Sequence, residues 1–322
     1  MEFSRRRKIP GTELEISPVS MGCWPIAGIS SLEVNDIDSQ ATIEAALEMG
    51  VNHFDTAYSY GYEGQSDRLL QRVLKGQYDR VVISSKVGSH YTSDRTRVID
   101  SDPQRLAQQL EEIRQRLAID CIDLLYLHAP DRKTPIEKVA EAFADWRAKG
   151  WIRHACLSNA TAEETRRFGS IEPLALLQPY FNMLQQEEVE GLRPVAFEQN
   201  IGIACYWPLM KGLLAGKLLR DHVFHPVDRR LTYPIYQGDE WQKNQDFMDR
   251  IRAMANELGW SVPRLVIRWT MDQPGITTVL CGAKRPDQIA ESAEAMESSL
   301  PVEVMQVIDA AIAERMHGPI KG

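Results

Sequence analysis

Short apolar runs alternate with segments of helical periodicity along almost the whole chain, and this alternation constrains the fold more than any other feature. The runs are rich in Val, Ile and Leu, and they have the length of buried strands. They lie at 19–23, 51–55, 81–86, 122–127, 152–157, 174–178, 201–205 and 277–281. Eight strands that alternate with helices predict an α/β protein built as a (β/α)8 TIM barrel, rather than separate helical and sheet lobes.

The segments between the runs carry helix signals. The clearest is 103–118, where Pro103 suits the first helical position and four apolar residues, spaced by four, three and four positions, share one helical face. Those four residues are Leu106, Leu110, Ile113 and Leu117.

Capping boxes predict where two further helices begin. Thr134 and Glu137 have the spacing of such a box, with Pro135 at the first helical position and Gly150 as a left-handed residue after the last turn. A second box, at Thr161 and Glu164, precedes the next helix. Both signals place helices where the barrel requires them.

Three segments depart from a plain barrel. Residues 5–18 form a short polar stretch with a turn at Gly11, which predicts a hairpin that closes the bottom of the barrel. Residues 207–240 form a long connection after the seventh strand, and such connections are usually functional. Residues 301–314 predict an extra C-terminal helix. No linker composition or internal repeat interrupts the pattern, so we expect residues 1–322 to form a single domain.

The charge balance and the apolar runs limit the partners. A net charge of −8 argues against nucleic acid or an anionic membrane as the main partner. The basic start has no apolar segment behind it, so no secretory signal is expected, and no apolar run approaches the roughly 20 residues that span a bilayer. We therefore expect a cytoplasmic protein that acts on small molecules, and its oligomeric state stays open.

The cysteines are scattered in or beside the predicted strands, and no two of them form a CxxC pair. We interpret them as reduced packing residues of a cytoplasmic protein rather than catalytic thiols, and we predict no metal site. They are Cys23, Cys121, Cys156, Cys205 and Cys281.

Four chemically active residues lie at the ends of different predicted strands or just past them. Asp55 ends the second run, Tyr60 follows it, Lys86 ends the third run and His128 follows the fourth. Taken singly, the aspartate suits a turn or helix cap, the tyrosine a surface aromatic, and the histidine a structural hydrogen bond. In a barrel, however, the carboxyl ends of the strands converge on one face, where catalysis takes place. Their convergence predicts a proton-transfer site.

The chemistry of these residues depends on their proximity. Free tyrosine and lysine titrate at about 10 and 10.4, so neither alone transfers protons readily near neutral pH. An ammonium beside a phenol lowers the pKa of the phenol, and a carboxylate beside the ammonium keeps it charged. We expect Tyr60 to donate a proton to a developing alkoxide while His128 orients or polarises the same oxygen. This chemistry suits reversible hydride transfer to an aldehyde or ketone.

Six motifs, in this order, resemble those of the aldo-keto reductase superfamily. They are FDTAYSYGYEGQSDRLL at 54–70, SSK at 84–86, LLYLHAPD at 124–131, LSN at 157–159, YWPLMKGLLAGK at 206–217 and GAKRPDQIAES at 282–292. The resemblance runs from about residue 8 to 300. It implies a (β/α)8 barrel that uses NADPH without a Rossmann domain, and the chain contains no G-x-G-x-x-G motif.

The resemblance also implies roles for individual residues. It makes Asp55, Tyr60, Lys86 and His128 the catalytic residues, with Tyr60 as the general acid of reduction. The implied nicotinamide contacts are Ser158, Asn159 and Gln178 through the carboxamide, and Tyr206 through ring stacking. The implied contacts to the rest of the NADPH molecule are Leu209, Gly212 and Lys217 near the pyrophosphate, Gly282, Lys284, Arg285 and Gln288 near the adenosine 2′-phosphate, and Glu291 near the adenine.

The chain departs from the family pattern beside the expected cofactor site. Trp207 replaces a usual small serine, Ser292 replaces a usual asparagine, and Met210 is larger than the common residue. We expect Trp24, just after the first strand, and Trp207 to contact the substrate, and the loops at 88–101 and 207–240 to form walls of its pocket.

Three functions remain open from the sequence. The first is NADPH-dependent reduction of aldehydes, ketones or sugar-like carbonyls to alcohols. The second is a barrel lyase in which Lys86 forms a Schiff base with the substrate, although the neighbouring Tyr60 and the cofactor motifs disfavour it. The third is a nucleotide-sensing accessory subunit with weak activity or none, which the four residues at the strand ends do not exclude.

Overall fold

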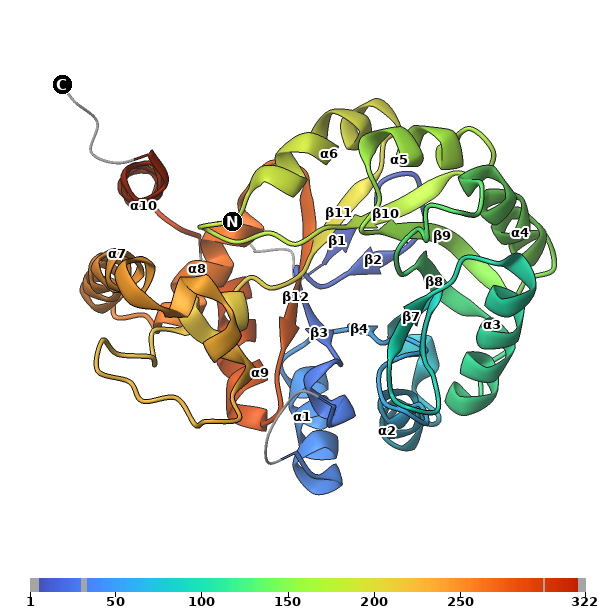
Figure 1. The fold of residues 1–322 in the computed structure, drawn as a ribbon, viewed down its shortest axis with the longest axis horizontal. Helices are drawn as coiled ribbons and strands as arrows, with labels where there is room; N and C mark the ends of the chain where they lie inside the picture. Colours follow the sequence, from blue (N-terminus) through green and yellow to red (C-terminus); the bar gives the residue numbers. More distant parts are fainter. Residues whose placement is uncertain (1–5, 30–33, 298, 318–322) are drawn as a thin grey trace.

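The computed structural model describes residues 6–29, 34–297 and 299–317, and its strands form a barrel surrounded by helices (Figure 1). Eight parallel strands close the barrel in the order β10-β11-β12-β3-β4-β5-β8-β9. They are β3 (Val19–Gly22), β4 (His53–Asp55), β5 (Val82–Val87), β8 (Ile122–Leu127), β9 (Ile152–Ser158), β10 (Leu174–Gln178), β11 (Gly202–Cys205) and β12 (Ile276–Gly282). Each predicted apolar run overlaps one strand, so the prediction of a (β/α)8 barrel is confirmed.

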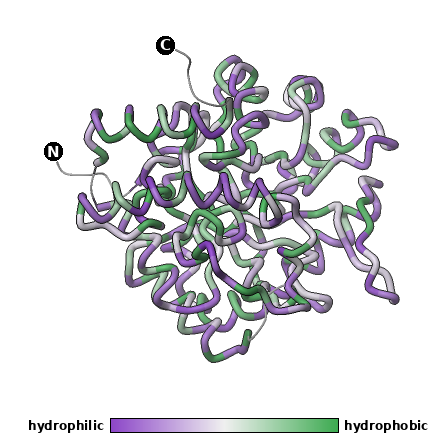
Figure 2. The backbone as a smooth tube through the Cα atoms, turned by 60° about the vertical axis from the view of Figure 1, so that its left-hand side comes forward, coloured by the Kyte–Doolittle hydropathy of each residue, from purple (hydrophilic) through white to green (hydrophobic). Residues whose placement is uncertain are grey.

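One helix of the outer ring follows each barrel strand. They are α1 (Asp36–Glu48), α2 (Gln65–Leu74), α3 (Pro103–Leu117), α4 (Ile136–Ala148), α5 (Ala162–Gly169), α6 (Glu187–Glu198), α8 (Val262–Met271) and α9 (Pro286–Ala293). Figure 2 shows hydrophobic and hydrophilic residues alternating along these helices, as expected when one face packs on the barrel. The four apolar residues predicted to share a face of α3 are all fully buried: Leu106, Leu110, Ile113 and Leu117.

Two helices lie outside the ring and pack on each other at one side of the barrel (Figure 1). The predicted C-terminal helix is present as α10 (Val302–His317), whereas α7 (Gly238–Glu257), after the long connection, was not expected. Arg250 pairs with Glu314 at 2.5 Å, and Arg315 pairs with Glu240 at 2.6 Å. The indole of Trp269 on α8 donates to Asp309 at 2.8 Å, which ties α10 to the ring.

The remaining elements are short. Two antiparallel hairpins pair β1 (Arg7–Lys8) with β2 (Glu15–Ile16), and β6 (Ser89–Tyr91) with β7 (Arg97–Ile99). The described 3-10 helices are η1 (Pro25–Ala27), η2 (Tyr78–Arg80), η3 (Met210–Ala215), η4 (Arg229–Thr232), η5 (Pro234–Tyr236) and η6 (Glu294–Glu297).

The β1–β2 hairpin closes the amino-terminal end of the barrel, as predicted. Its residues Ile9 and Ile16 are fully buried against interior residues of the barrel strands. The guanidinium of Arg7 donates to the carbonyl of Ile276, at the start of β12, at 3.0 Å. The carboxyl-terminal end of the barrel, opposite the hairpin, is therefore the end where a functional site can form.

One predicted capping box is wrong. Helix α4 begins at Ile136, after an N-terminal Pro135 that is not helical, and no side chain caps it. The carboxylate of Asp131 instead accepts from the backbone N–H of Thr134 at 2.8 Å and from its hydroxyl at 3.0 Å. The Thr134 hydroxyl is bonded to Asp131 in the preceding loop and therefore does not cap α4.

The other predicted helix signals agree with the structure. Thr161 and Glu164 form both hydrogen bonds of a capping box at the start of α5. Gly150 has a φ of 72° just after α4, in the left-handed region that glycine adopts without strain. All five cysteines are free, and Cys121 is the exception to their burial, since it is partly exposed. Within the described residues, no helix is long and apolar enough to cross a membrane.

Candidate active site

Three barrel strands bring the predicted catalytic residues to the carboxyl end of the barrel. Asp55 is the last residue of β4, Lys86 lies near the end of β5, and His128 directly follows β8. Tyr60 lies in the loop after β4, where its backbone N–H bonds to the carbonyl of Ala57 at 2.9 Å. The parallel barrel therefore gathers residues that are 73 positions apart, counting from Asp55 to His128.

A buried ion pair lies at the centre of this group. The Lys86 ammonium donates to Asp55 Oδ2 at 2.5 Å, to the carbonyl of Thr56 at 2.9 Å and to the hydroxyl of Tyr60 at 3.2 Å. All three donor positions of the ammonium are used. The side chains of Lys86 and Asp55 are only 1% and 3% exposed, so water does not screen the pair.

The carboxylate of Asp55 is held from its other side by two further donors. Its Oδ1 accepts from the hydroxyl of Ser84 at 2.8 Å and from the amide of Gln178 at 2.9 Å. Asp55 and Ser84 are register neighbours on β4 and β5, so the sheet itself sets this contact. Full hydrogen bonding is what a buried carboxylate requires.

This environment sets the charges of the two central groups. Burial lowers the pKa of Lys86, but the carboxylate of Asp55 raises it, and the result lies above the ordinary value. Burial raises the pKa of Tyr60, and the Lys86 ammonium opposes this rise without cancelling it. Lysine does lower the tyrosine pKa, as the sequence predicted, but desolvation outweighs it. Tyr60 is therefore a phenol at neutral pH, ready to donate a proton.

His128 is a neutral imidazole. Burial, the Lys86 ammonium and the Arg97 guanidinium, in that order, hold its pKa well below the ordinary value. Its ring centroid lies 6.1 Å from that of Tyr60. Arg97 Nη2 lies 3.2 Å from His128 Nε2, and a guanidinium can only donate, so Nε2 accepts and the ring proton lies on Nδ1. Among the residues that the structure describes, Nδ1 has no partner.

Arg97 is a residue that the sequence did not indicate. It lies on β7 of the hairpin inserted between β5 and α3, inside the loop at 88–101 that we expected only to form a wall of the pocket. No apolar pattern or motif marks this hairpin, and its strands have three residues each. The contact with His128 therefore appears only in three dimensions.

The predicted nicotinamide contacts form a polar cluster next to His128. The amide of Asn159 donates to the carbonyl of His128 at 2.8 Å and to the hydroxyl of Ser158 at 3.0 Å. The hydroxyl of Tyr206 donates to Asn159 Oδ1 at 3.0 Å, and that of Ser158 donates to the carbonyl of Gln178 at 2.8 Å. The side chain of Gln178 itself binds Asp55, so it connects this cluster to the ion pair.

The connection after β11 turns sharply beside Tyr206. Trp207, Met210, Lys211 and Gly212 have positive φ values of 60°, 44°, 51° and 95°. Sharp turns of this kind can direct successive backbone N–H groups into a concave, anion-binding surface. Trp207 is 42% exposed and the Lys211 ammonium lies 4.4 Å from its ring centroid, while Leu209 is partly buried.

The residues predicted to bind the adenosine half lie farther along, around the end of β12 and the start of α9. Lys217 pairs with Glu291 at 3.1 Å, so two predicted contacts bind each other. Arg285 pairs with Asp287 at 3.2 Å. The side chain of Gln288 accepts from the backbone N–H of Lys284 at 3.0 Å, and Ser292 is buried with its hydroxyl bonded to the carbonyl of Gln288 at 2.9 Å. Gly282 ends β12 next to Pro25, where a Cβ would lie 2.9 Å from that ring.

The two predicted substrate contacts lie in different surroundings. The ring of Trp24 makes an edge contact with Tyr60, with 5.1 Å between their centroids, so it borders the predicted catalytic tyrosine. Trp207 makes an edge contact with Tyr206 at 5.4 Å, which places it beside the polar cluster rather than beside Tyr60.

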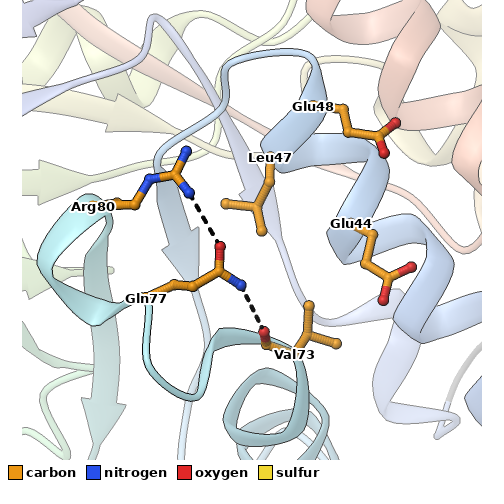
Figure 3. Close-up of a pocket in the computed structure, with 6 residues that line it drawn as sticks. All are labelled: Glu44, Leu47, Glu48, Val73, Gln77 and Arg80. Carbon is orange, nitrogen blue, oxygen red and sulfur yellow. Dashed lines mark hydrogen bonds between the residues drawn. The ribbon is translucent and has the colours of Figure 1, made fainter.

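A separate surface pocket of about 310 Å³ lies between α1 and the segment that leads into β5 (Figure 3). Its lining residues are Glu44, Leu47, Glu48, Val73, Gln77 and Arg80. It lies toward the amino-terminal end of β5, whereas Lys86 lies toward the carboxyl end, so it is not part of the candidate site. Within the described ranges, no group of three or more acidic, cysteine or histidine residues is arranged to hold a metal ion.

Comparison with known proteins agrees with the barrel and the motifs. A model of the aldo/keto reductase family matches residues 18–313. The chain is 30% identical over 323 residues to the aldo-keto reductase YhdN of Bacillus subtilis (strain 168), an alignment that covers 99% of this chain and 96% of that protein. The chain belongs to the aldo/keto reductase family, whose members are oxidoreductases of carbonyl substrates.

Other relatives differ in their cofactors and substrates. The NADH-specific methylglyoxal reductase of Escherichia coli (strain K12) is 27% identical, over 91% of this chain and 94% of that protein. The aldo-keto reductase yakc [NADP(+)] of Schizosaccharomyces pombe (strain 972 / ATCC 24843) is 28% identical, over 87% and 83%. The structure of the glycerol dehydrogenase AKR11B4 from Gluconobacter oxydans is similar with a TM-score of 0.91 and 31% identity, over 100% of this chain and 98% of that one.

We expect the imidazole of His128 to stay neutral through the pH range in which an unfolded histidine titrates, because its pKa in the folded protein is well below the value of about 6.5 in an unfolded chain. The unfolded chain then binds the extra proton, so this residue lowers the stability as the pH falls below about 6.5. The ring signals can be followed by NMR, with His128→Gln for assignment. A titration midpoint near the unfolded value would contradict the expectation.

Proposed function

We propose that the protein reduces aldehydes, ketones or sugar-like carbonyls to alcohols with NADPH, and that Tyr60 is the general acid. The observation that carries the proposal is the Lys86 ammonium, which contacts the Asp55 carboxylate and the Tyr60 hydroxyl at the same time. An ion pair alone would be structural. A phenol hydrogen-bonded to a buried ammonium is a proton donor whose conjugate base is stabilised before the reaction begins.

The step assigned to these residues is a proton transfer. The bound nicotinamide supplies the hydride that reaches the carbonyl carbon. Tyr60 gives its proton to the carbonyl oxygen, the phenolate remains beside Lys86, and solvent restores the proton. Lys86 stays protonated throughout because Asp55 holds it charged. In the reverse direction the phenolate accepts the alcohol proton, so oxidation is favoured at higher pH.

Several residues fit a nicotinamide dinucleotide at the same end of the barrel. Asn159 and Ser158 offer amide and hydroxyl groups for a carboxamide, and the partly buried ring of Tyr206 offers a stacking surface beside them. The turn at 207–212 and the cations Lys284 and Arg285 suit phosphate groups. We propose NADPH rather than NADH for this chain because of those two cations, although relatives use one or the other.

The two competing functions are less well supported. A Schiff-base lysine needs a neutral amine, usually with a lowered pKa. Lys86 has a raised pKa and an aspartate partner, so the lyase reading is disfavoured. An accessory subunit with weak activity or none would show little or no turnover with any carbonyl tested. The free cysteines fit the reducing cytoplasm that we propose as its compartment.

Tyr60→Phe should lose nearly all carbonyl reduction, because it removes the proton donor while leaving the aromatic ring. NADPH binding should be retained. Steady-state rates and fluorescence titration would measure the two quantities. Tyr58→Phe is a matched control, since that hydroxyl binds Glu112 at 3.0 Å and does not contact the ion pair. Turnover of Tyr60→Phe within about tenfold of the wild type, roughly 1.4 kcal/mol in the barrier, would refute the assignment.

NADPH should bind more tightly than NADH, and a Lys284→Ala, Arg285→Ala double variant should lose this preference. Charged hydrogen bonds are worth about 1.5–3 kcal/mol, so the gap should be about ten- to a hundredfold. Because Arg285 already pairs with Asp287, we expect an affinity gap near the lower end of this range. Fluorescence titration measures the affinities for both cofactors. The double variant should lose affinity for NADPH and keep its affinity for NADH, and this loss should become smaller as the salt concentration rises.

The control for this pair is a Lys75→Ala, Arg80→Ala double variant, which removes two exposed cations near the amino-terminal end of the barrel. It should leave both affinities unchanged. Equal affinities for NADPH and NADH in the wild type would mean that Lys284 and Arg285 form only a solvated helix start.

A further inference from the structure

We propose that Arg97 selects carbonyl substrates that carry an oxyanion, a carboxylate or a phosphate, a few bonds from the reacting carbonyl. This inference rests on the proposed function, because it assumes that the carbonyl oxygen lies between Tyr60 and His128. It names the substrate class of that same site. Neither the four predicted catalytic residues nor the predicted cofactor contacts include Arg97.

Arg97 is held at the mouth of the site by the hairpin that carries it. Its Nε donates to the hydroxyl of Ser89 at 2.8 Å, across the β6–β7 pair, and Ser89 is fully buried. Its Nη2 lies 3.2 Å from His128 Nε2. The residue is exposed at this position, so an incoming molecule can reach the guanidinium. The guanidinium is therefore held by two hydrogen bonds on a residue that is exposed to solvent.

No carboxylate neutralises this guanidinium within the part of the chain that the structure describes, where its two hydrogen bonds go to Ser89 and His128. The other cation of the site, Lys86, is neutralised by Asp55, and His128 is uncharged. Arg97 thus contributes a positive charge beside the reacting groups that no described residue pairs. In a protein of net charge −8, such a charge attracts anionic substrates locally.

Arg97 and a substrate carbonyl make opposite demands on the same nitrogen. Arg97 can only donate, so His128 Nε2 must accept from it. A carbonyl oxygen can only accept, so Nε2 must carry the proton to orient it. An oxyanion that draws the guanidinium onto itself removes this conflict and leaves Nε2 free to donate. The planar fork of arginine suits both carboxylate and phosphate oxygens.

The distances limit the size of the substrate. A carbonyl oxygen must lie within hydrogen-bond reach of the His128 ring, roughly 2.6–3.2 Å. The Arg97 nitrogen lies 3.2 Å from that ring. The substrate carbonyl can therefore reach His128 while the oxyanion reaches Arg97 only when a few bonds separate the two groups. Small oxo acids and phosphorylated short-chain aldehydes have this spacing.

The test compares pairs of substrates that differ in the charged group. Succinic semialdehyde is compared with butanal for a carboxylate, and glyceraldehyde 3-phosphate with glyceraldehyde for a phosphate. Wild-type protein should favour the anionic member of at least one pair in kcat/KM. In Arg97→Gln the ratio of anionic to neutral kcat/KM should fall about ten- to a hundredfold, mainly through KM for the anion. Arg97→Lys should keep part of the ratio.

Arg95→Gln is the matched control. Arg95 lies in the turn of the same hairpin, but its guanidinium stacks on Tyr62, 4.6 Å from the ring centroid, and does not contact His128. Its replacement should leave the ratio unchanged. Preference for one anionic member alone supports the proposal and identifies the anion as carboxylate or phosphate.

Two results would overturn the inference while the proposed function stands. One is equal kcat/KM for anionic and neutral members in the wild type. The other is an equal loss for both members in Arg97→Gln, which would mean that Arg97 only orders His128. If no carbonyl is reduced at all, the proposed function fails, and calorimetric titration with succinate and inorganic phosphate still decides this inference. Binding weakened by Arg97→Gln supports it, and equal or absent binding refutes it.

Discussion

The buried contact between Lys86 and Asp55 is the interaction on which the rest of the site depends. Breaking such a pair by removing one partner typically costs about 3–5 kcal/mol, because the other charge stays buried and unpaired. Further hydrogen bonds stabilise the two buried charges. Ser84 and Gln178 donate to the carboxylate, and the ammonium donates to the carbonyl of Thr56. Ser84 lies on β5, Gln178 on β10 and Thr56 directly after β4, so a closed sheet is needed to assemble these partners.

The same ion pair and its buried surroundings set the protonation states of the neighbouring Tyr60 and His128. Burial keeps Tyr60 protonated at neutral pH, while Lys86 limits the cost of forming the phenolate. His128 is kept neutral, so it can orient a substrate without competing for the proton. Reduction is therefore expected to persist through neutral pH and to decline only as the pH rises through the raised pKa of Tyr60.

The sequence predicts those features that depend on periodicity or on strand ends. Eight apolar runs suffice for the barrel, and their ends locate Asp55 and Lys86 because parallel strands share one carboxyl edge. The capping box at Thr134 fails because Asp131, a residue of the preceding loop, captures its hydroxyl. Arg97 could not be predicted, since strands of three residues are too short to show a periodic apolar pattern. The net rise in the pKa of Tyr60 depends on burial, which no local motif encodes.

The central claim is that Lys86 acts on Tyr60 through its charge, and the pH dependence of alcohol oxidation tests it most directly. In the wild type, kcat/KM for oxidation should rise with pH as Tyr60 loses its proton. In Lys86→Met, and in a Lys86→Met, Asp55→Asn double variant that leaves no unpaired carboxylate, that rise should move to higher pH and the rate should fall. Normal activity with an unchanged pH profile in these variants would contradict the account.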